Sequence, residues 1–305
     1  MSRGGDLNAS LAYQAQAFLE HELMSDLQTL CKLCKELGVE QNLCLSGGTA
    51  LNSVANQRCF EQSDFRRLFL HPACSDDGTV IGAALEHWHL TLKQPRKIRS
   101  NRSAMYSLRE YDTAIPLVLE RRSKALRVRQ TADYVSETAK LLAEGKVLGW
   151  YQGASEIGPR ALGNRSILAD PRREGMPKYL NETIKKRETF RPFAPSVLQE
   201  FSQEWFGIAD SPFMLRVAKV LKNSVPAITH VDGTARIQTL RKEDNPTYHK
   251  LIESFMGITG IPLVLNTSFN GKGEPIVESP EDAINCLFSS NLDAVVFPER
   301  IVTKR

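Results

Sequence analysis

The stretch GASEIGPRALGNRSILADPR at 153–172, followed by IKKRETFRPFAPSVLQ at 184–199, decides how the rest of this sequence is interpreted. Between Ser155 and Pro195 there are nine Lys or Arg residues and five Asp or Glu residues, a net charge of +4 that equals the net charge of the whole chain. Glycine and proline interrupt the basic residues, so the backbone exposes N–H groups beside the guanidinium groups. This combination suits a small, highly charged anion such as a phosphate or an acyl phosphate.

Length and composition describe an ordinary globular protein. A chain of 305 residues is expected to form about two domains with an ample core. Its net charge of +4 comes without an extended basic stripe, which argues against a nucleic-acid-binding protein. The sequence has no signal-peptide core and no run of about 18 apolar residues, so we expect a cytoplasmic protein without a membrane span.

Two of the six cysteines form the pair Cys31-x-x-Cys34. No second pair follows at a spacing typical of zinc sites, and i and i+3 share one face of the helix expected there. We therefore expect buried free thiols, with a metal or redox role as the alternative.

The first 60 residues combine a long helix with a turn that can bind anions. Apolar residues recur at helical spacing over 8–37, and Asn42–Leu45 reads as a short buried strand. Ser46-Gly47-Gly48 then leads into a helix, a geometry in which unpaired amides meet a ligand closely. Tight packing alone is the alternative function of the two glycines. Asn52 and Asn56 lie at i and i+4 and could face a ligand together.

A second polar turn, at 71–78, opens the helix expected over 79–89. Asp76 and Asp77 would cap this helix, or else serve as ligands of a hard metal or of a phosphate-bound Mg²⁺. The basic, non-periodic residues 91–112 are a candidate linker between domains.

Helices and strands alternate in the rest of the chain, which indicates an α/β or α+β fold. The periodicities predict helices over 131–144, 246–256 and 280–288, and strands over 146–150, 213–220, 236–240, 261–265 and 294–297.

Several polar groups in this part could act on a phosphorylated substrate. Arg160 and Arg165 flank Ala-Leu-Gly-Asn, and a second basic group, Lys185, Lys186, Arg187 and Arg191, follows about twenty residues later. Two solvated surface clusters are the alternative. Arg236 and Gln238 are placed on one strand face, and the strand over 261–265 ends in a run of amides and hydroxyls. Without a nucleophilic triad or a Walker loop, the chemistry would be positioning and polarisation.

Six motifs together resemble the NodU/CmcH-type O-carbamoyltransferase family, in the order of that family. They are LCLSGGTALNSVAN, HPACSDDGTVIGAAL, GASEIGPRALGNRSILADPR, KKRETFRPFAPSV, VDGTARIQTL and GIPLVLNTSFNGKGEPIVESPEDA. The resemblance covers about residues 8–300. It implies an α/β protein in which a partial actin-like-ATPase-type subdomain (1–95) and a linker (96–105) precede a YrdC-like domain (106–305) with a twisted mixed sheet.

The resemblance also implies a function. The YrdC-like part would use carbamoyl phosphate and ATP, with Mg²⁺, to form carbamoyladenylate, and the transferase part would pass the carbamoyl group to a hydroxyl of a sugar or natural-product acceptor. By this similarity the catalytic residues are Lys186, Arg187, Arg191 and Arg236. Those binding carbamoyl phosphate and ATP are Arg160, Asn164, Arg165, Ser166, Gln238, Asn266, Ser268 and Asn270. The residues that would bind a nucleotide in the transferase part are Ser46, Gly47, Gly48 and Asn52. The residue that would bind a metal is Asp76.

The sequence departs from the family in one large respect. The upstream half of the transferase domain, with its His-x-x-x-His metal motif, does not occur in these 305 residues. We therefore expect a fragment, a split-gene product or a short paralogue. It would hold a divalent metal, commonly iron, only if a partner chain or homo-oligomer supplied the histidines.

Two other functions remain as alternatives. One is a non-catalytic nucleotide- or phosphate-binding module with a regulatory role. The other is a double-stranded-RNA binder, which the mild charge and the lack of interleaved aromatic residues argue against.

Overall fold

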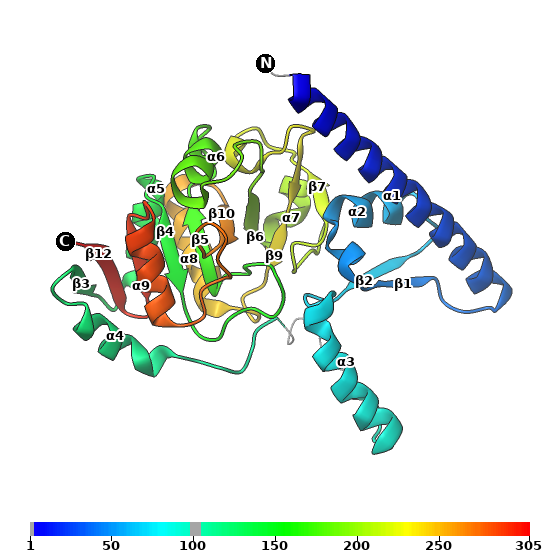
Figure 1. The fold of residues 1–305 in the computed structure, drawn as a ribbon, viewed down its shortest axis with the longest axis horizontal. Helices are drawn as coiled ribbons and strands as arrows, with labels where there is room; N and C mark the ends of the chain where they lie inside the picture. The colour runs from blue at the N-terminus through cyan, green and yellow to red at the C-terminus, as the bar shows by residue number, and fades with distance from the viewer. Residues whose placement is uncertain (1–2, 98–104) are drawn as a thin grey trace.

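The structure is a computed structural model that describes residues 3–97 and 105–305, with side chains from residue 8 onward (Figure 1). Most of the predicted linker at 96–105 lies outside these ranges. The described residues form a large domain around one sheet and a smaller N-terminal unit beside it (Figure 1).

An eight-stranded mixed sheet forms the centre of the large domain, as predicted for an α/β protein. Its strands pair in parallel at β4/β11 and β6/β9 and antiparallel elsewhere. In spatial order they are β3 (Leu126–Gln130), β12 (Arg300–Lys304), β11 (Ala294–Phe297), β4 (Leu148–Tyr151), β5 (Arg165–Ala169), β10 (Leu263–Ser268), β6 (Ala194–Leu198) and β9 (Gln238–Leu240).

Helices cover both faces of this sheet. On β4, Trp150 contacts Tyr134 and Tyr248, whereas its neighbour Tyr151 contacts Phe297 and donates a hydrogen bond to the Glu278 carbonyl. Because successive strand residues point to opposite faces, α5 and α8 cover one face and α9 the other. The helices of this domain are α4 (Ile115–Arg121), α5 (Tyr134–Ala143), α6 (Met176–Tyr179), α7 (Gln199–Phe206), α8 (Pro246–Thr259) and α9 (Pro280–Ser289).

Local sequence sets the ends of α8 and the start of α9. Asn245 caps α8 by accepting from the Tyr248 N–H, and Gly260 ends it in a left-handed conformation. Ser279 and Asp282 form a capping box at the start of α9. The predicted helices at 246–256 and 280–288 are confirmed, each with a proline in its first turn.

The predicted strand at 236–240 is in fact divided between two sheets. β8 (Thr234–Arg236) pairs with β7 (Val217–Lys219) in a small separate sheet, whereas β9 belongs to the large sheet. The chain changes sheets at the buried residue Ile237. The expectation that Arg236 and Gln238 share one strand face is therefore wrong. The strand expected over 213–220 is reduced to β7.

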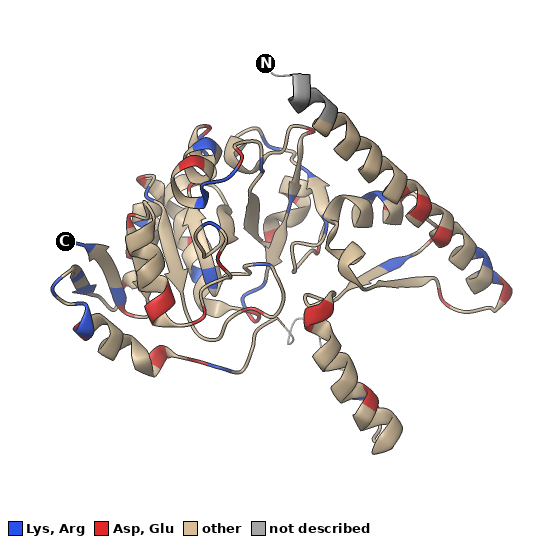
Figure 2. Ribbon diagram, viewed as in Figure 1, with Lys and Arg blue, Asp and Glu red and all other residues tan. Residues whose placement is uncertain are grey.

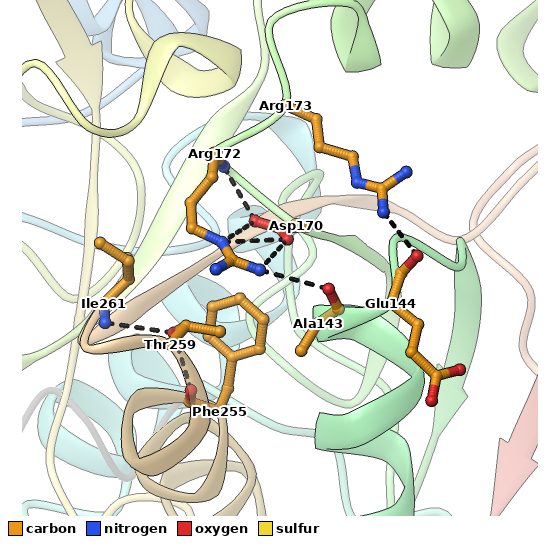
Figure 3. A network of polar contacts seen from close by, with 8 residues as sticks. All are labelled: Ala143, Glu144, Asp170, Arg172, Arg173, Phe255, Thr259 and Ile261. Carbon is orange, nitrogen blue, oxygen red and sulfur yellow. Dashed lines mark hydrogen bonds and ion pairs between the residues drawn. The ribbon is translucent and has the colours of Figure 1, made fainter.

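Two arginines of the positively charged segment between Ser155 and Pro195, Arg172 and Arg173, stabilise the fold (Figure 3). Arg172 forms a bidentate ion pair with the buried carboxylate of Asp170, at 2.6 Å from Nη2 to Oδ2 and 2.9 Å from Nε to Oδ1. The same guanidinium donates to the Ala143 carbonyl at the end of α5 and lies 5.8 Å from the Phe255 ring of α8. Arg173 donates to the next carbonyl, that of Glu144. These two arginines therefore fasten the end of β5 to the helices.

The N-terminal unit packs the long helix α1 (Arg3–Glu36) against a two-stranded parallel sheet, β1 (Asn42–Leu45) with β2 (Arg67–Leu70), and α2 (Ser53–Glu61). Its core consists of Leu27, Cys31, Leu43, Cys59 and Phe65. The predicted helix and strand are confirmed, but only Leu43 of β1 is buried. Cys31 and Cys34 are free, with Cys31 buried as expected. An actin-like-ATPase-type origin of this unit stays a prediction.

Helix α3 (Thr79–Glu86) continues into a π-helical turn at His87–Thr91 and extends away from the rest of the molecule (Figures 1 and 2). Glu86 is its one charged residue, and Val80 and Leu85 are more than half exposed. None of the helices in the described ranges has the length and apolar character needed to cross a membrane.

The two parts of the molecule share an apolar cluster. Ala50, Leu70 and Cys74 of the N-terminal unit pack against Leu162 and Phe213 of the large domain. Gly158 lies so close to the 71–78 turn that a Cβ atom there would be 2.3 Å from the Pro72 carbonyl oxygen. The loop that carries Arg160 is therefore built directly on the N-terminal unit.

Candidate functional site

Four arginines from distant parts of the chain line one cavity of about 290 Å³, which we call the arginine pocket. Among the residues that the structure describes, no Asp or Glu lines this cavity. Its lining residues are Ser53, Val54, Arg160, Arg187, Arg191, Pro192, Phe193, Ala194, His230, Arg236, Asn266 and Thr267. Like charges at such short range repel each other, so the pocket is prepared for an anion.

Arg236 lies at the end of β8, where three other arginine side chains of the pocket are its neighbouring charges. Burial, followed by the neighbouring cations of Arg160, Arg187 and Arg191, lowers the pKa of Arg236 to about 9. Its Nε atom is shielded from solvent and has no hydrogen-bond partner. An anion that enters the pocket would supply both the missing acceptor and the missing negative charge.

Arg160 and Arg187 are held in place from outside the cavity. Arg160 donates from Nη2 to the Leu51 carbonyl at 3.2 Å, which links the pocket to the N-terminal unit, and its Nε is unpartnered. Arg187 donates from Nε to Asn181 Oδ1 at 2.7 Å, and its guanidinium lies 5.0 Å from the Phe193 ring. Burial and then the cation of Arg191 lower the pKa of Arg187 to about 10. Both guanidinium groups are therefore oriented before any ligand binds.

Asn181 is a positioning residue that the sequence analysis missed. Besides accepting from Arg187, this buried side chain donates from Nδ2 to the carbonyls of Thr189 and Arg191. It thus fixes the whole Arg187–Arg191 loop. An asparagine between two basic groups carries no distinctive pattern in one sequence, so only the fold reveals it.

Lys185, rather than its predicted neighbour Lys186, is the buried lysine of this region. Its Nζ donates to the Ser268 carbonyl, to Ser268 Oγ at 3.2 Å, to the Asn270 carbonyl at 3.2 Å and to Asn270 Oδ1 at 2.6 Å. Burial, and after it the cation of Arg187, lower the pKa of Lys185 to about 7. Ser268 and Asn270 therefore hold a lysine beside the pocket. Lys186 is exposed, in a left-handed conformation after a π-helical turn.

Arg165 lies outside the cavity, on the fully buried strand β5. Its guanidinium stacks 3.5 Å from the Tyr151 ring and donates to four backbone carbonyls, those of Gln152, Gly153, Asn164 and Glu278. These acceptors take four of the five N–H groups of the guanidinium, so the structure gives the side chain a role in holding the 152–165 loop.

Three further residues predicted to bind the substrate also face the protein interior. Asn164 bonds to Gln152 and Asn245, and Ser166 Oγ accepts from the Gly163 N–H. Gln238 bonds to Ser196 and to the Leu162 carbonyl. They build the wall behind the arginine pocket.

A second cavity, of about 450 Å³, lies in the N-terminal unit. Ser46 and Gly47 meet Asp76 there, as the resemblance implies. Ser46 Oγ donates to the Cys74 carbonyl at 3.2 Å, and a Cβ atom on Gly48 would lie 3.6 Å from Ser75 Oγ. The two Ser- and Gly-rich turns therefore form one site from residues nearly thirty positions apart.

The two asparagines expected to face a ligand together do not do so. Asn52 caps α2 by accepting from the Ala55 N–H, and its Nδ2 donates to Gln16 Oε1 of α1. Asn56 is buried and donates to the carbonyls of Ala50 and Leu215. Neither lines the second cavity. Asn56 therefore links α2 to the 50–52 turn and to the large domain instead of facing a ligand.

Two family models match this sequence, the carbamoyltransferase N-terminus over residues 3–85 and the carbamoyltransferase C-terminus over residues 139–304. The chain belongs to the carbamoyltransferase family, of the NodU/CmcH type.

Curated relatives of this carbamoyltransferase-family chain are about twice as long. The nodulation protein NolO of Bradyrhizobium diazoefficiens is 40% identical over 98% of this chain and 55% of its own length. The 3'-hydroxymethylcephem-O-carbamoyltransferase of Amycolatopsis lactamdurans is 32% identical over 88% of this chain and 50% of its own. The chain thus spans about half the length of these relatives. The solved structure of full-length HypF in the phosphate- and nucleotide-bound form is similar with a TM-score of 0.40 and 18% identity, over 55% of this chain and 25% of HypF.

The family resemblance implies a metal at Asp76, and the residues present do not complete a site for it. Within residues 3–97 and 105–305, no three His, Cys, Asp or Glu side chains are grouped so that they could hold a metal ion. Asp76 lies in an exposed 3₁₀ turn at 76–78, where Asp77 Oδ1 accepts from the Ser75 N–H. One carboxylate cannot select iron, so no chemistry of this chain is assigned to that metal.

The position of Arg165 predicts the effect of replacing it in this member of the carbamoyltransferase family. Arg165→Ala leaves four carbonyls without their donor and removes the stacking on Tyr151, so we expect the free energy of unfolding to fall by about 2–4 kcal/mol. Thermal denaturation measures this. Sulfate binding, measured by calorimetry below the unfolding temperature, should change by less than about tenfold. A loss of sulfate binding with an unchanged melting temperature would show that Arg165 binds the ligand and is not needed for stability.

Proposed function

We propose that this chain binds carbamoyl phosphate and ATP at the arginine pocket and the adjoining Lys185 cluster, and forms carbamoyladenylate there. The observation that carries the proposal is the pocket itself, in which four guanidinium groups converge without a carboxylate among the lining residues. Membership of the carbamoyltransferase family supports a carbamoyl donor as the anion.

The charges of the two reactants explain why so many cations are needed. An acyl phosphate dianion must approach the triphosphate of ATP, and repulsion between them opposes every step. The net change consumes one water, forms a bond between a carbamoyl oxygen and the α-phosphorus, and releases phosphate and pyrophosphate. Arg160, Arg187 and Arg236 would neutralise the donor and the developing charge, while Lys185 fixes the loop that carries Ser268 and Asn270. Mg²⁺ accompanies ATP as in other phosphoryl-transfer reactions.

We further propose that carbamoyl transfer to a hydroxyl-bearing small molecule involves the second cavity. The Ser46-Gly47 turn lines this cavity, and the turn is linked to the arginine pocket through Leu51, whose carbonyl accepts from Arg160. Similarity to the 3'-hydroxymethylcephem-O-carbamoyltransferase of Amycolatopsis lactamdurans is consistent with a hydroxyl acceptor. Sequence beyond this chain in the relatives would complete the acceptor site.

Calorimetric titration with carbamoyl phosphate, and with ATP and Mg²⁺, tests the binding step of the proposal. We expect both ligands to bind the wild-type chain and to compete with sulfate. If sulfate binds and neither substrate competes with it, the pocket serves another anion and the proposal is wrong.

The low pKa values in the site predict a pH dependence of anion binding. Three cations lose their protons in succession as pH rises, Lys185 with a pKa of about 7, Arg236 of about 9 and Arg187 of about 10. Affinity for sulfate, whose own charge does not change in this range, should therefore weaken steadily from about pH 7 to about pH 10. A dissociation constant that stays flat over this range would show that the three groups keep ordinary pKa values.

A further inference from the structure

One side-chain amide, that of Asn266, lies among the cations that line the arginine pocket. Asn266 lies on β10 between its partners β5 and β6, lines the cavity and is 1% exposed. Its amide nitrogen donates to the Ala161 carbonyl at 3.1 Å, to Ser196 Oγ at 2.9 Å and to Gln238 Oε1 at 3.3 Å. Its amide oxygen, Oδ1, is shielded from solvent and has no partner.

The orientation of this amide is determined by its neighbours. Gln238 donates from Nε2 to the Leu162 carbonyl at 2.8 Å, and its Oε1 accepts from Ser196 Oγ at 2.6 Å. Gln238 therefore presents an acceptor to Asn266, and the Ala161 carbonyl presents a second one. Only the NH₂ group of Asn266 can satisfy both, so Oδ1 is the atom left over.

An unpartnered acceptor in a cationic cavity restricts which anions fit well. Guanidinium groups bind any phosphate oxygen, so Arg160, Arg187 and Arg236 cannot distinguish one acyl phosphate from another. A buried acceptor is costly unless the ligand brings an N–H or O–H to it. At neutral pH a carbamoyl phosphate dianion carries an NH₂ group, whereas an acetyl phosphate dianion of nearly the same shape carries a methyl group in its place.

We infer that Asn266 Oδ1 accepts a hydrogen bond from the carbamoyl NH₂ group and makes the pocket select a carbamoyl phosphate over acyl phosphates that lack an N–H. This inference rests on the proposed function, because it assumes that the pocket takes the carbamoyl donor. Asn266 is thereby a specificity-determining residue, and the methyl analogue leaves its oxygen buried and unpaired. A site that hydrogen-bonds a substrate N–H rejects the analogue without it.

Ser53 and Thr267 also line this cavity and carry hydroxyl groups that can accept a hydrogen bond. A third polar side chain in the lining is His230. Its Nδ1 lies 3.2 Å from Thr234 Oγ1, and the Thr234 hydroxyl donates to Asp232 Oδ1 at 2.7 Å. That arrangement places a proton on Nδ1, and the ring also forms a hydrogen bond with the Phe193 backbone. Variants of Asn266 and His230 must therefore be compared.

Two stable phosphonates that differ only in the group of interest serve as probes. Phosphonoacetamide carries the NH₂ group, and 2-oxopropylphosphonate carries a methyl group at the same position. We expect the wild-type chain to bind the amide more tightly by roughly tenfold to a hundredfold in calorimetric titration. In Asn266→Ala the ratio of the two dissociation constants should fall to about 1–3, since only the amide loses a partner.

The ratio, rather than either affinity alone, is the readout, because Asn266→Ala also disturbs Ser196 and Gln238. Asn164→Ala is the matched control, as Asn164 is a buried asparagine outside the cavity and its loss should leave the ratio unchanged. Equal binding of both probes by the wild type would overturn this inference alone, and would do so even if Asn266→Ala failed to fold. A ratio that survives Asn266→Ala and collapses in His230→Ala would overturn it as well. If the wild type binds neither probe but binds sulfate, the proposed function falls and this inference with it.

Discussion

Arg236→Met is expected to make the protein more stable and to abolish most of its anion binding. The guanidinium of this half-buried residue is desolvated and faces Arg160, Arg187 and Arg191, with no carboxylate among the described residues that line the pocket, and its pKa is lowered to about 9 as a result. An apolar side chain of similar length removes this repulsion and the desolvation cost, so the free energy of unfolding should rise by roughly 1–3 kcal/mol. Sulfate affinity should fall by about 10- to 150-fold, the value of a charge-assisted hydrogen bond. Thermal denaturation and calorimetry measure the two effects.

Lys186→Met provides the comparison. Lys186 has the same charge and lies one residue from Lys185, but it is exposed and does not line the pocket. We expect smaller changes in both stability and sulfate affinity, because exposed charges are screened by solvent. If Arg236→Met destabilised the chain and left sulfate binding intact, the arginine pocket would be a structural feature and not a ligand site.

Lys185→Met should have the opposite effect on stability, although Lys185 is also a buried cation. Its Nζ is surrounded by oxygens of Ser268 and Asn270, and removing it takes the lysine donor away from these half-buried oxygens, while Ser268 Oγ still donates to Asn270 Oδ1. Loss of the charge relieves desolvation, but unpaired acceptors cost about 1–3 kcal/mol each, so the net free energy of unfolding should fall by roughly 2–4 kcal/mol. Turnover should fall by at least about a hundredfold, because the 268–270 loop loses its anchor.

Lys185→Arg distinguishes a general need for charge from this particular geometry. A guanidinium is larger and planar, so it cannot donate to the same clustered oxygens as an ammonium. We therefore expect no rescue by arginine. Recovery of turnover in Lys185→Arg would mean that a positive charge near Ser268 is sufficient and that the network seen here is not required.

These predictions also show how far the sequence alone leads. Arg160, Arg187, Arg191, Arg236 and Asn266 were chosen from motifs far apart in the chain, and the fold brings all five to one cavity. Arg160, Arg187 and Arg191 come from Gly- and Pro-interrupted basic segments, whereas Arg236 and Asn266 come from an expected strand and the end of another, and the family resemblance joined them in one site. The family models confirm that the chain belongs to the carbamoyltransferase family.

The assignments that departed from the structure share a physical cause. Arg165 and Ser166 lie on β5, a strand whose five residues are all buried. Because the strand begins with an arginine and a serine, its sequence does not show the continuous apolar run expected of a buried strand. Once β5 is in the sheet, Arg165 must find acceptors inside the protein and is unavailable to a ligand. Lys185 and Lys186 differ by one position, and only the π-helical turn at 180–185 decides which of them points inward.

The position of Arg236 could not be obtained from its strand pattern either. Alternation over 236–240 placed it beside Gln238, but a change of sheet at Ile237 separates them. Such a change depends on the partners β7 and β6, which lie some twenty to forty residues earlier in the chain. Pairing between strands that are distant in the sequence cannot be recognised from a short stretch of it.

The central claim is that the arginine pocket activates a carbamoyl group with ATP, and pyrophosphate release tests it most directly. The purified chain is incubated with ATP and Mg²⁺, with and without carbamoyl phosphate and with no acceptor, beside Arg236→Met as the control. The account predicts pyrophosphate release that requires carbamoyl phosphate and falls by at least about tenfold in the variant. No release by a wild-type chain that demonstrably binds both substrates would contradict it, and would identify a binding module without turnover.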